Sequence, residues 1–163
     1  MPQLGHGGGM VAGDVTRVRC EVNTGATVVL TTQASTKVFH CRRGGCVRQE
    51  VRATVAAGAL LAVIADPVVP YEDSRFLQRQ TFRLDKGLTA TDGLSQNEGG
   101  SLVLVDWYTS GRRGRGEQWR FRHYESINDV YVGDSLLVHD AVCTHLNRMN
   151  HHPEKSRCQA FTA

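Results

Sequence analysis

The sequence predicts a mainly β protein: a stacked, helix-like antiparallel β-structure of repeated hairpins, with little helix. Two observations predict it. Apolar and charged side chains alternate with a period of two in several separate stretches of the 163-residue chain. A strand–glycine–strand unit also recurs, with Gly25 and Gly58 at the same place in two copies 33 residues apart. The length fits one ordinary domain, and 40% hydrophobic and 21% charged residues are typical of a globular chain.

The alternation places apolar side chains on one face and arginines on the other in four stretches: 16–22, 47–55, 75–84 and 117–125. In the third stretch the apolar face also carries Gln78 and Gln80. Residues 129–140 predict a hairpin that turns at Gly133 and Asp134. We interpret the arginine rows as the solvated face of a sheet rather than as a binding stripe.

The repeated unit covers residues 21–33 and 54–66, each a strand, a Gly-Ala turn, an apolar strand and a polar end. A third copy follows if residues 87–100, which have the composition of a flexible loop, are an insertion. Stacked hairpins with this period would bring their polar ends to similar depth, where they could line a path. These ends are Gln33, Asp66 and Asp106.

The expected organisation is a partial β domain over residues 1–143 and an irregular C-terminal tail over 144–163, which shows no clean period. The glycine-rich start and this tail lead us to expect a truncated chain with uncapped strand edges. The five cysteines form no disulfide framework, which favours reduced thiols and a cytoplasmic location. We expect no membrane span, because no apolar run approaches about 20 residues, and a net charge of +3 does not argue for nucleic acid.

Neither a metal motif nor a catalytic motif is strong. His40, Cys41 and Cys46 favour a surface hairpin over a zinc site. A looser group near the tail comprises His139, Cys143, His145, His151 and His152. There is no G-x-S-x-G elbow, so a small hydrolase would need a base beside Ser35, Thr36 or Ser110. Asp66 and Asp106, at the ends of apolar strands, are either hydrogen-bonded corner residues or an acidic lining.

The motifs in order are similar to those of the UreD (UreH) family of urease accessory proteins, above all the plant, algal and fungal members. Each family motif is met in turn: a glycine-rich segment ending at Asp14, TTQASTKV at 31–38, Asp66-Pro67, Leu102 to Asp106-Trp107, Gly111-Arg112 and Gly116-Glu117. The resemblance covers roughly residues 7–143. The chain lacks the family's strand-rich segment before the glycines and its longer part after the hairpin, and the insertion at 87–100 is not typical.

The resemblance implies a scaffold for urease maturation, not an enzyme. It implies binding to UreF, UreG and apo-urease, a homodimer formed through the accessory complex, and nickel in transit with no tightly bound cofactor. An acidic path for Ni²⁺ would use Asp14, Asp106 and Asp140, with Thr36 and Lys37 beside it; Asp66 is a further candidate from its polar-end position. Oxygen ligands suit weak, exchangeable contact with Ni²⁺. The first alternative is a β-rich protein-interaction module without a metal role, and the less favoured one is the small hydrolase.

Overall fold

The computed structural model describes residues 8–41, 44–89, 96–146 and 153–155. The regular structure in these residues is almost entirely β-strand, with a 3-10 turn at Arg113–Arg115. The predicted mainly β class is therefore confirmed. In the described part of the chain, no helix has the length and apolar character needed to cross a membrane.

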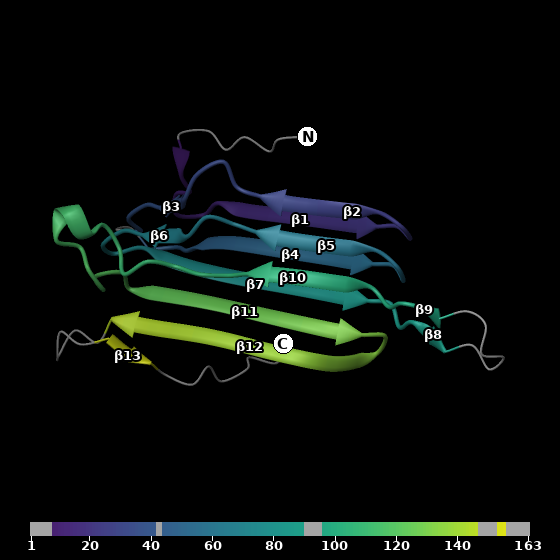
Figure 1. The fold of residues 1–163 in the computed structure, drawn as a ribbon. Coiled ribbons are helices and arrows are strands. Elements are labelled where there is room, and N and C mark those ends of the chain that lie inside the picture. Colours follow the sequence, from purple (N-terminus) through teal and green to yellow (C-terminus); the bar gives the residue numbers. More distant parts are fainter. Residues whose placement is uncertain (1–7, 42–43, 90–95, 147–152, 156–163) are drawn as a thin grey trace.

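The largest sheet has the strand order β1-β4-β7-β11-β12-β13 (Figure 1). Its first four strands pair in parallel. The expected antiparallel pairing between repeats is wrong, because each repeat returns to run in the same direction beside the one before it; antiparallel pairing begins at the β11–β12 hairpin. The strands are Val15–Val22, Val47–Val55, Arg75–Leu84, His123–Val132, Ser135–Leu146 and Pro153–Lys155.

A second sheet lies over the first, as Figure 1 shows, and consists of three parallel strands in the order β10-β5-β2. These strands are Ser101–Val105, Leu60–Ile64 and Thr27–Thr31. A short third pair, β3 (Thr36–Val38) with β6 (Val68–Pro70), is extended on its two sides by isolated bridges, from Val38 to Met10 and from Val68 to Tyr108.

The predicted repeat is confirmed as one coil of this stack. Each coil has a long strand, a turn and a returning strand, and the three coils are β1–β2, β4–β5 and β7–β10. The first two turns place Gly25 and Gly58 at φ of 74° and 70°, a left-handed conformation that glycine adopts without strain. In the long strands, Val22 pairs with Val55 and Val55 with Leu84, so the coils stay in register.

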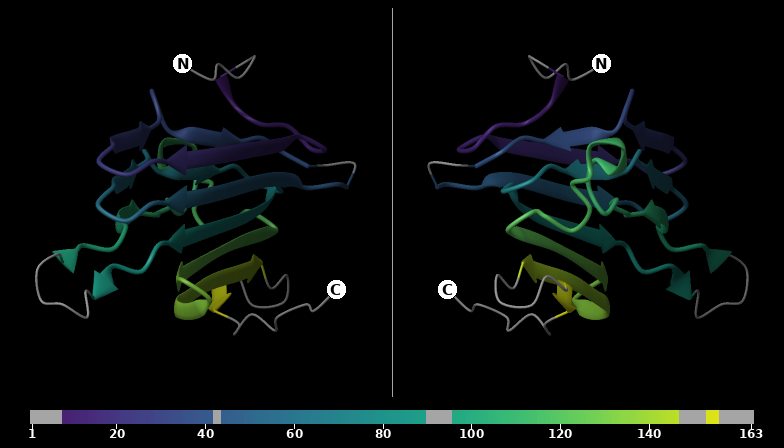
Figure 2. Two further views of the ribbon diagram at one scale, coloured as in Figure 1. Left: turned by 90° about the vertical axis from the view of Figure 1, so that its right-hand side faces the viewer. Right: turned by 90° about the vertical axis from the view of Figure 1, so that its left-hand side faces the viewer.

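The third coil carries the predicted insertion at its turn. The chain leaves β7, forms the short antiparallel pair β8 (Leu88–Thr89) and β9 (Gln96–Asn97), and returns to β10. Gly100 N donates to Asp85 O at 3.0 Å, so the two ends of the excursion meet. Figure 2 shows β8 and β9 projecting from the body of the stack.

The expected boundary at residue 143 differs from the structure. The hairpin strand β12 continues to Leu146, and β13 at Pro153–Lys155 adds a strand beside it. Regular structure therefore extends into the range that the sequence predicts to be an irregular tail.

The main core fills the space between the two larger sheets. Its centre consists of inward side chains of both layers, such as Val55, Leu61 and Phe82, which are fully buried. A second cluster around Phe76 and Tyr124 lies beneath the β3–β6 pair. The second sheet has three strands, whereas the first continues through β11 and β12. Among the described residues, no strand of the second sheet therefore continues the layer opposite the inner face of β11 and β12.

Candidate functional site

Asp106 lies immediately after β10 with its carboxylate toward the large sheet. Its Oδ1 accepts a hydrogen bond from Gln78 Nε2 at 3.0 Å, and its Oδ2 accepts from Ser126 Oγ at 2.6 Å and Asn128 Nδ2 at 2.8 Å. The strand alternation explains this orientation, because Leu102 and Leu104 precede Asp106 on the core side. Three donors satisfy most of the acceptor capacity of the carboxylate and fix it in place.

The hydrogen-bonded row continues across the sheet to Asp140. Gln80 Nε2 donates to Asn128 Oδ1 at 2.9 Å, and Asn128 Nδ2 lies 3.5 Å from Asp140 Oδ2. Asn128 and Asp140 are direct partners in the β11–β12 ladder. Gln80 and Asn128 are buried, whereas Asp140 is exposed. The row thus runs from the interior to the surface, and it explains why the apolar face of β7 carries glutamines.

Asp106 and Asp140 share one open groove with a volume of about 440 Å³. Asn128 lies between them, and the remaining walls are apolar: Leu84, Leu102, Leu104, Val130, Leu137 and Val138. The groove lies where the second sheet ends and the large sheet continues. Two carboxylates in one groove can attract a divalent cation, and oxygen ligands alone bind ions such as Ni²⁺ weakly.

An aromatic stack supports the site from the core. The rings of Tyr108 and Tyr124 stack at 3.9 Å, and the Tyr108 hydroxyl lies 3.2 Å from Thr144 Oγ1. Burial, with a smaller contribution from the Asp106 charge, raises the pKa of Tyr124. Tyr124 therefore stays a neutral phenol and adds no charge to the groove.

The third carboxylate of the expected path, Asp14, is placed elsewhere. Asp14 is exposed, and its Oδ2 accepts a hydrogen bond from Val11 N at 2.8 Å, which closes the turn before β1. Strand β1 is three positions from β11 in the sheet, or about 14 Å at ordinary strand spacing. One ion therefore cannot contact Asp14 and Asp106 together, although the two can be separate points along a route.

Asp66 also differs from the expectation that the polar strand ends share one depth. It follows Ile64 on the outer side of β5 and is exposed. Its Oδ2 accepts from Thr32 Oγ1 at 3.1 Å, and its N donates to the same hydroxyl at 2.8 Å. Asp66 is a corner residue that joins two coils, whereas Asp106 faces inward.

Thr36 and Lys37 lie on β3, where their backbones hold neighbouring segments. Thr36 N donates to Pro67 O at 3.1 Å, and Lys37 O accepts from Met10 N at 2.8 Å. The Lys37 side chain is exposed and that of Thr36 is half-buried. A role for these two side chains beside a path stays a prediction.

In the described part of the chain, no hydrogen bond joins the hydroxyl of Ser35, Thr36 or Ser110 to a histidine or a carboxylate.

The Gly-Arg and Gly-Glu motifs form a structural unit. Arg112 Nε donates to Glu117 Oε2 at 2.8 Å, and Arg112 Nη2 pairs with Glu117 Oε1. The guanidinium lies 3.8 Å from the centre of the Tyr71 ring, and Glu117 Oε2 also accepts from Glu72 N at 3.2 Å. The paired guanidinium lowers the pKa of Glu117 and outweighs the opposing effect of burial.

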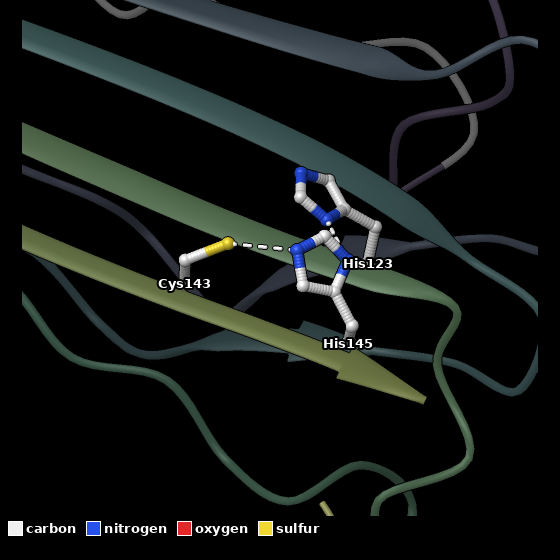
Figure 3. Close-up of side chains that lie close together, drawn as sticks. All are labelled: His123, Cys143 and His145. Atoms are coloured by element: carbon white, nitrogen blue, oxygen red, sulfur yellow. Dashed lines mark hydrogen bonds between the residues drawn. The ribbon is translucent and has the colours of Figure 1, made fainter. Parts of the chain in front are cut away.

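A separate cluster lies on the outer face of the β11–β12 hairpin (Figure 3). Its members are His123, Cys143 and His145, whose potential ligand atoms all lie within 4.8 Å of one another. The sequence places Cys143 and His145 in a loose group but misses His123, which is 20 residues away from Cys143. The register expected from the turn at Gly133 would not have found it, because a bulge between Val130 and Tyr131 shifts the pairing of the two strands.

The model of the family described as UreD urease accessory protein matches residues 3–161. This chain belongs to the UreD family of urease accessory proteins. It is 43% identical over 129 residues to urease accessory protein D of Arabidopsis thaliana, covering 79% of this chain and 40% of the relative. It is 37% identical over 137 residues to urease accessory protein UreD of Anaeromyxobacter sp. (strain Fw109-5), covering 84% of this chain and 42% of the relative.

A UreD protein of Staphylococcus aureus (strain JH9) is 30% identical over 144 residues, covering 88% of this chain and 47% of the relative. The chain thus spans less than half the length of these UreD relatives. They are named as accessory proteins and not as enzymes, in agreement with the expected scaffold role.

Proposed function

We propose that this UreD chain acts in urease maturation as a scaffold that binds UreF and UreG, docks on apo-urease and passes Ni²⁺ along an acidic path. Membership of the urease accessory family supports the general role. The path is supported by one observation above all: Asp106 and Asp140 meet in a single groove, joined through Asn128.

The two carboxylates suit different parts of this task. Asp106 is held by three donors, so it supplies a fixed negative charge at the inner end of the groove. Asp140 is exposed and has one long contact, so its oxygens can turn toward an arriving cation. Nickel would then move between oxygen ligands as a cargo, without the thiolate or imidazole contacts that would retain it.

A cytoplasmic location is part of the same proposal. Cys20, Cys41 and Cys46 carry free thiols, which is typical of proteins in reducing compartments. The arginines on the outer face of β1 and β4 form ion pairs, for example Arg17 with Glu50 at 3.4 Å and Arg19 with Glu21 at 3.0 Å. This partial neutralisation favours a solvated face over a nucleic-acid surface.

The decisive experiment compares Asp140→Asn with Asp66→Asn, a matched exposed aspartate outside the groove. Both variants are introduced into the whole protein, and urease activation is measured at limiting nickel together with co-purification of UreF and UreG. We expect Asp140→Asn alone to reduce activation, to keep both partners and to recover with added nickel. Equal activation by the two variants would contradict the path.

A protein-interaction module without a metal role is favoured by a different observation. The outer face of β2, β5 and β10 exposes a row of apolar side chains: Val29, Ile64, Val103, Val105 and Trp107, each more than 40% exposed. A partner among the accessory proteins would cover such a face. This alternative predicts that Val103→Glu abolishes co-purification with UreF while the Asp140→Asn variant activates urease normally.

A further inference from the structure

The outer face of the β11–β12 hairpin gathers four side chains with metal-binding chemistry. In the antiparallel ladder, His123 pairs directly with His145, and Glu125 pairs directly with Cys143. Residues two apart on a strand share a face, so these two pairs occupy four adjacent positions on one side of the hairpin. They lie on the opposite side from Asp106 and its groove.

The side chains contact one another in sequence. His123 Nδ1 lies 2.9 Å from His145 Nδ1, and His145 Nε2 lies 3.1 Å from Cys143 Sγ, as the dashed lines in Figure 3 show. Glu125 Oε2 lies 3.5 Å from His123 Nε2. The two imidazoles and the thiol therefore place potential ligand atoms within 4.8 Å of one another, with a carboxylate beside Nε2 of His123.

We propose that His123, Cys143 and His145 form a binding site for a borderline-soft transition-metal cation of the Zn²⁺ class, and that Glu125 either orients His123 or completes the coordination. Three protein ligands of imidazole and thiolate type with one further position are a common zinc arrangement. A carboxylate hydrogen-bonded to a ligating histidine is the usual support for such a site. This inference does not depend on the proposed role in urease maturation.

The distances between the ligand atoms fit a tetrahedral metal site after a small adjustment of the side chains. Tetrahedral ligands at bond lengths of about 2.0–2.3 Å are separated by roughly 3.3–3.8 Å, and the three ligand atoms here lie within 4.8 Å. The backbone positions are fixed by the ladder, so the adjustment is a rotation of side chains. His145 is exposed and free of core packing, so it can make this rotation.

The ligand types decide the class of cation. A thiolate with two imidazoles favours Zn²⁺, Ni²⁺ and related ions over Mg²⁺ and Ca²⁺, which prefer oxygen. Such a site also retains its ion, in contrast to the all-oxygen groove of Asp106 and Asp140. The bound ion would join β11 to the hairpin strand β12 and so stabilise the folded state.

The test uses the full chain stripped of metal with a chelator. Zn²⁺ affinity is measured by competition with a chromophoric chelator, and Co²⁺ serves as a spectroscopic probe because a cobalt–thiolate bond gives a charge-transfer absorption. We expect binding of one ion per chain, the charge-transfer band, and a rise in Tm with Zn²⁺. Cys143→Ser should remove the band, and His123→Ala and His145→Ala should weaken Zn²⁺ binding at least about ten-fold.

Matched controls lie on the same hairpin and in the same core. His139→Ala removes a histidine on the same face that pairs with Asp129 at 2.6 Å, and Cys20→Ser removes another thiol; both should bind Zn²⁺ like the unmodified chain. His145 is exposed, so His145→Ala tests the site without disturbing the core. A cobalt–thiolate band that survives Cys143→Ser but disappears in Cys158→Ser, or equal Zn²⁺ affinities of His145→Ala and His139→Ala, would overturn the proposal.

Discussion

Arg112 and Glu117 form a two-bond ion pair that closes the loop between β10 and β11, with the guanidinium on the Tyr71 ring. Both side chains are largely shielded, with 23% and 10% of their surfaces exposed. Removing one partner leaves a poorly solvated charge without its counter-ion. The pair explains why the Gly-Arg and Gly-Glu motifs occur together in the sequence.

The first prediction concerns this pair. Glu117→Ala should lower the free energy of unfolding by about 3–5 kcal/mol, the usual cost of breaking a shielded ion pair from one side. Urea denaturation of the purified chain measures it. Glu50→Ala, which breaks the more exposed pairs with Arg17 and Arg52, should cost less than about 1 kcal/mol. Similar losses in both variants would argue against a special role for Arg112 and Glu117.

The second prediction is the pH dependence of the same interaction. The pKa of Glu117 is lowered from its ordinary value of 4.5, chiefly by the hydrogen bond from Arg112. The unfolded chain therefore binds a proton at higher pH than the folded chain, so this stabilisation is present above pH 4.5 and is lost as the pH falls through the lower, folded pKa. Unfolding free energies measured from pH 6 to pH 3 should fall more steeply in the unmodified chain than in Glu117→Gln. Parallel pH profiles would contradict the assignment.

The third prediction contrasts two glycines of one loop. Gly111 has a φ of 117°, and a Cβ there would lie 2.3 Å from the Glu117 carbonyl oxygen, whereas a Cβ on Gly114 would meet nothing within 4 Å. Gly111→Ala should therefore destabilise the fold by about 3 kcal/mol or more, and Gly114→Ala should leave it nearly unchanged. Thermal unfolding of the two variants compares them directly. Equal Tm values would show that the loop relaxes without cost.

The fourth prediction concerns the contribution of the Asp106 carboxylate to stability. A half-solvated carboxylate would contribute little to folding, but Asp106 accepts three hydrogen bonds from Gln78, Ser126 and Asn128. Asp106→Ala should cost about 1–3 kcal/mol because it leaves buried donors without partners. Asp140→Ala, at the exposed end of the row, should cost less than about 0.5 kcal/mol. Chemical denaturation of the two variants measures both losses. Equal losses would show that the Asp106 carboxylate is held no more firmly than that of Asp140.

The sequence correctly predicts three of the four alternating strands, the coil repeat and the hairpin, because alternation and glycine turns are local properties of the chain. The strand expected over residues 117–125 is wrong at its start: the chain forms turns until β11 begins at His123, and Trp119 has a φ of 58°. The sequence does not predict whether neighbouring coils pair in parallel or antiparallel, since both arrangements have the same alternation of apolar and charged residues. It also misplaces Asp66. Asp106 is one residue beyond the end of its strand and Asp66 is two residues beyond, and a difference of one residue moves a side chain from the inner to the outer face. Asp106 falls on the inner side of that alternation and Asp66 on the outer side.

The cluster of His123, Cys143 and His145 is a further feature that the sequence alone does not predict. Counting back from the turn at Gly133 places His123 opposite Thr144, which lies on the other face of the hairpin from His145. A bulge between Val130 and Tyr131 shifts the register by one residue and brings His123 opposite His145. The bulge is a tertiary feature without a clear sequence signature here, so the cluster becomes visible only in the structure.

The excursion between β7 and β10 begins and ends at one hydrogen bond, from Gly100 N to Asp85 O. A loop closed at its base leaves the coil register unchanged whatever its length, and longer loops add little entropic cost. The excursion is therefore a suitable place to insert a tag or a label. An affinity tag or a fluorescent label spliced between β8 and β9 should leave the pairing of the coils intact.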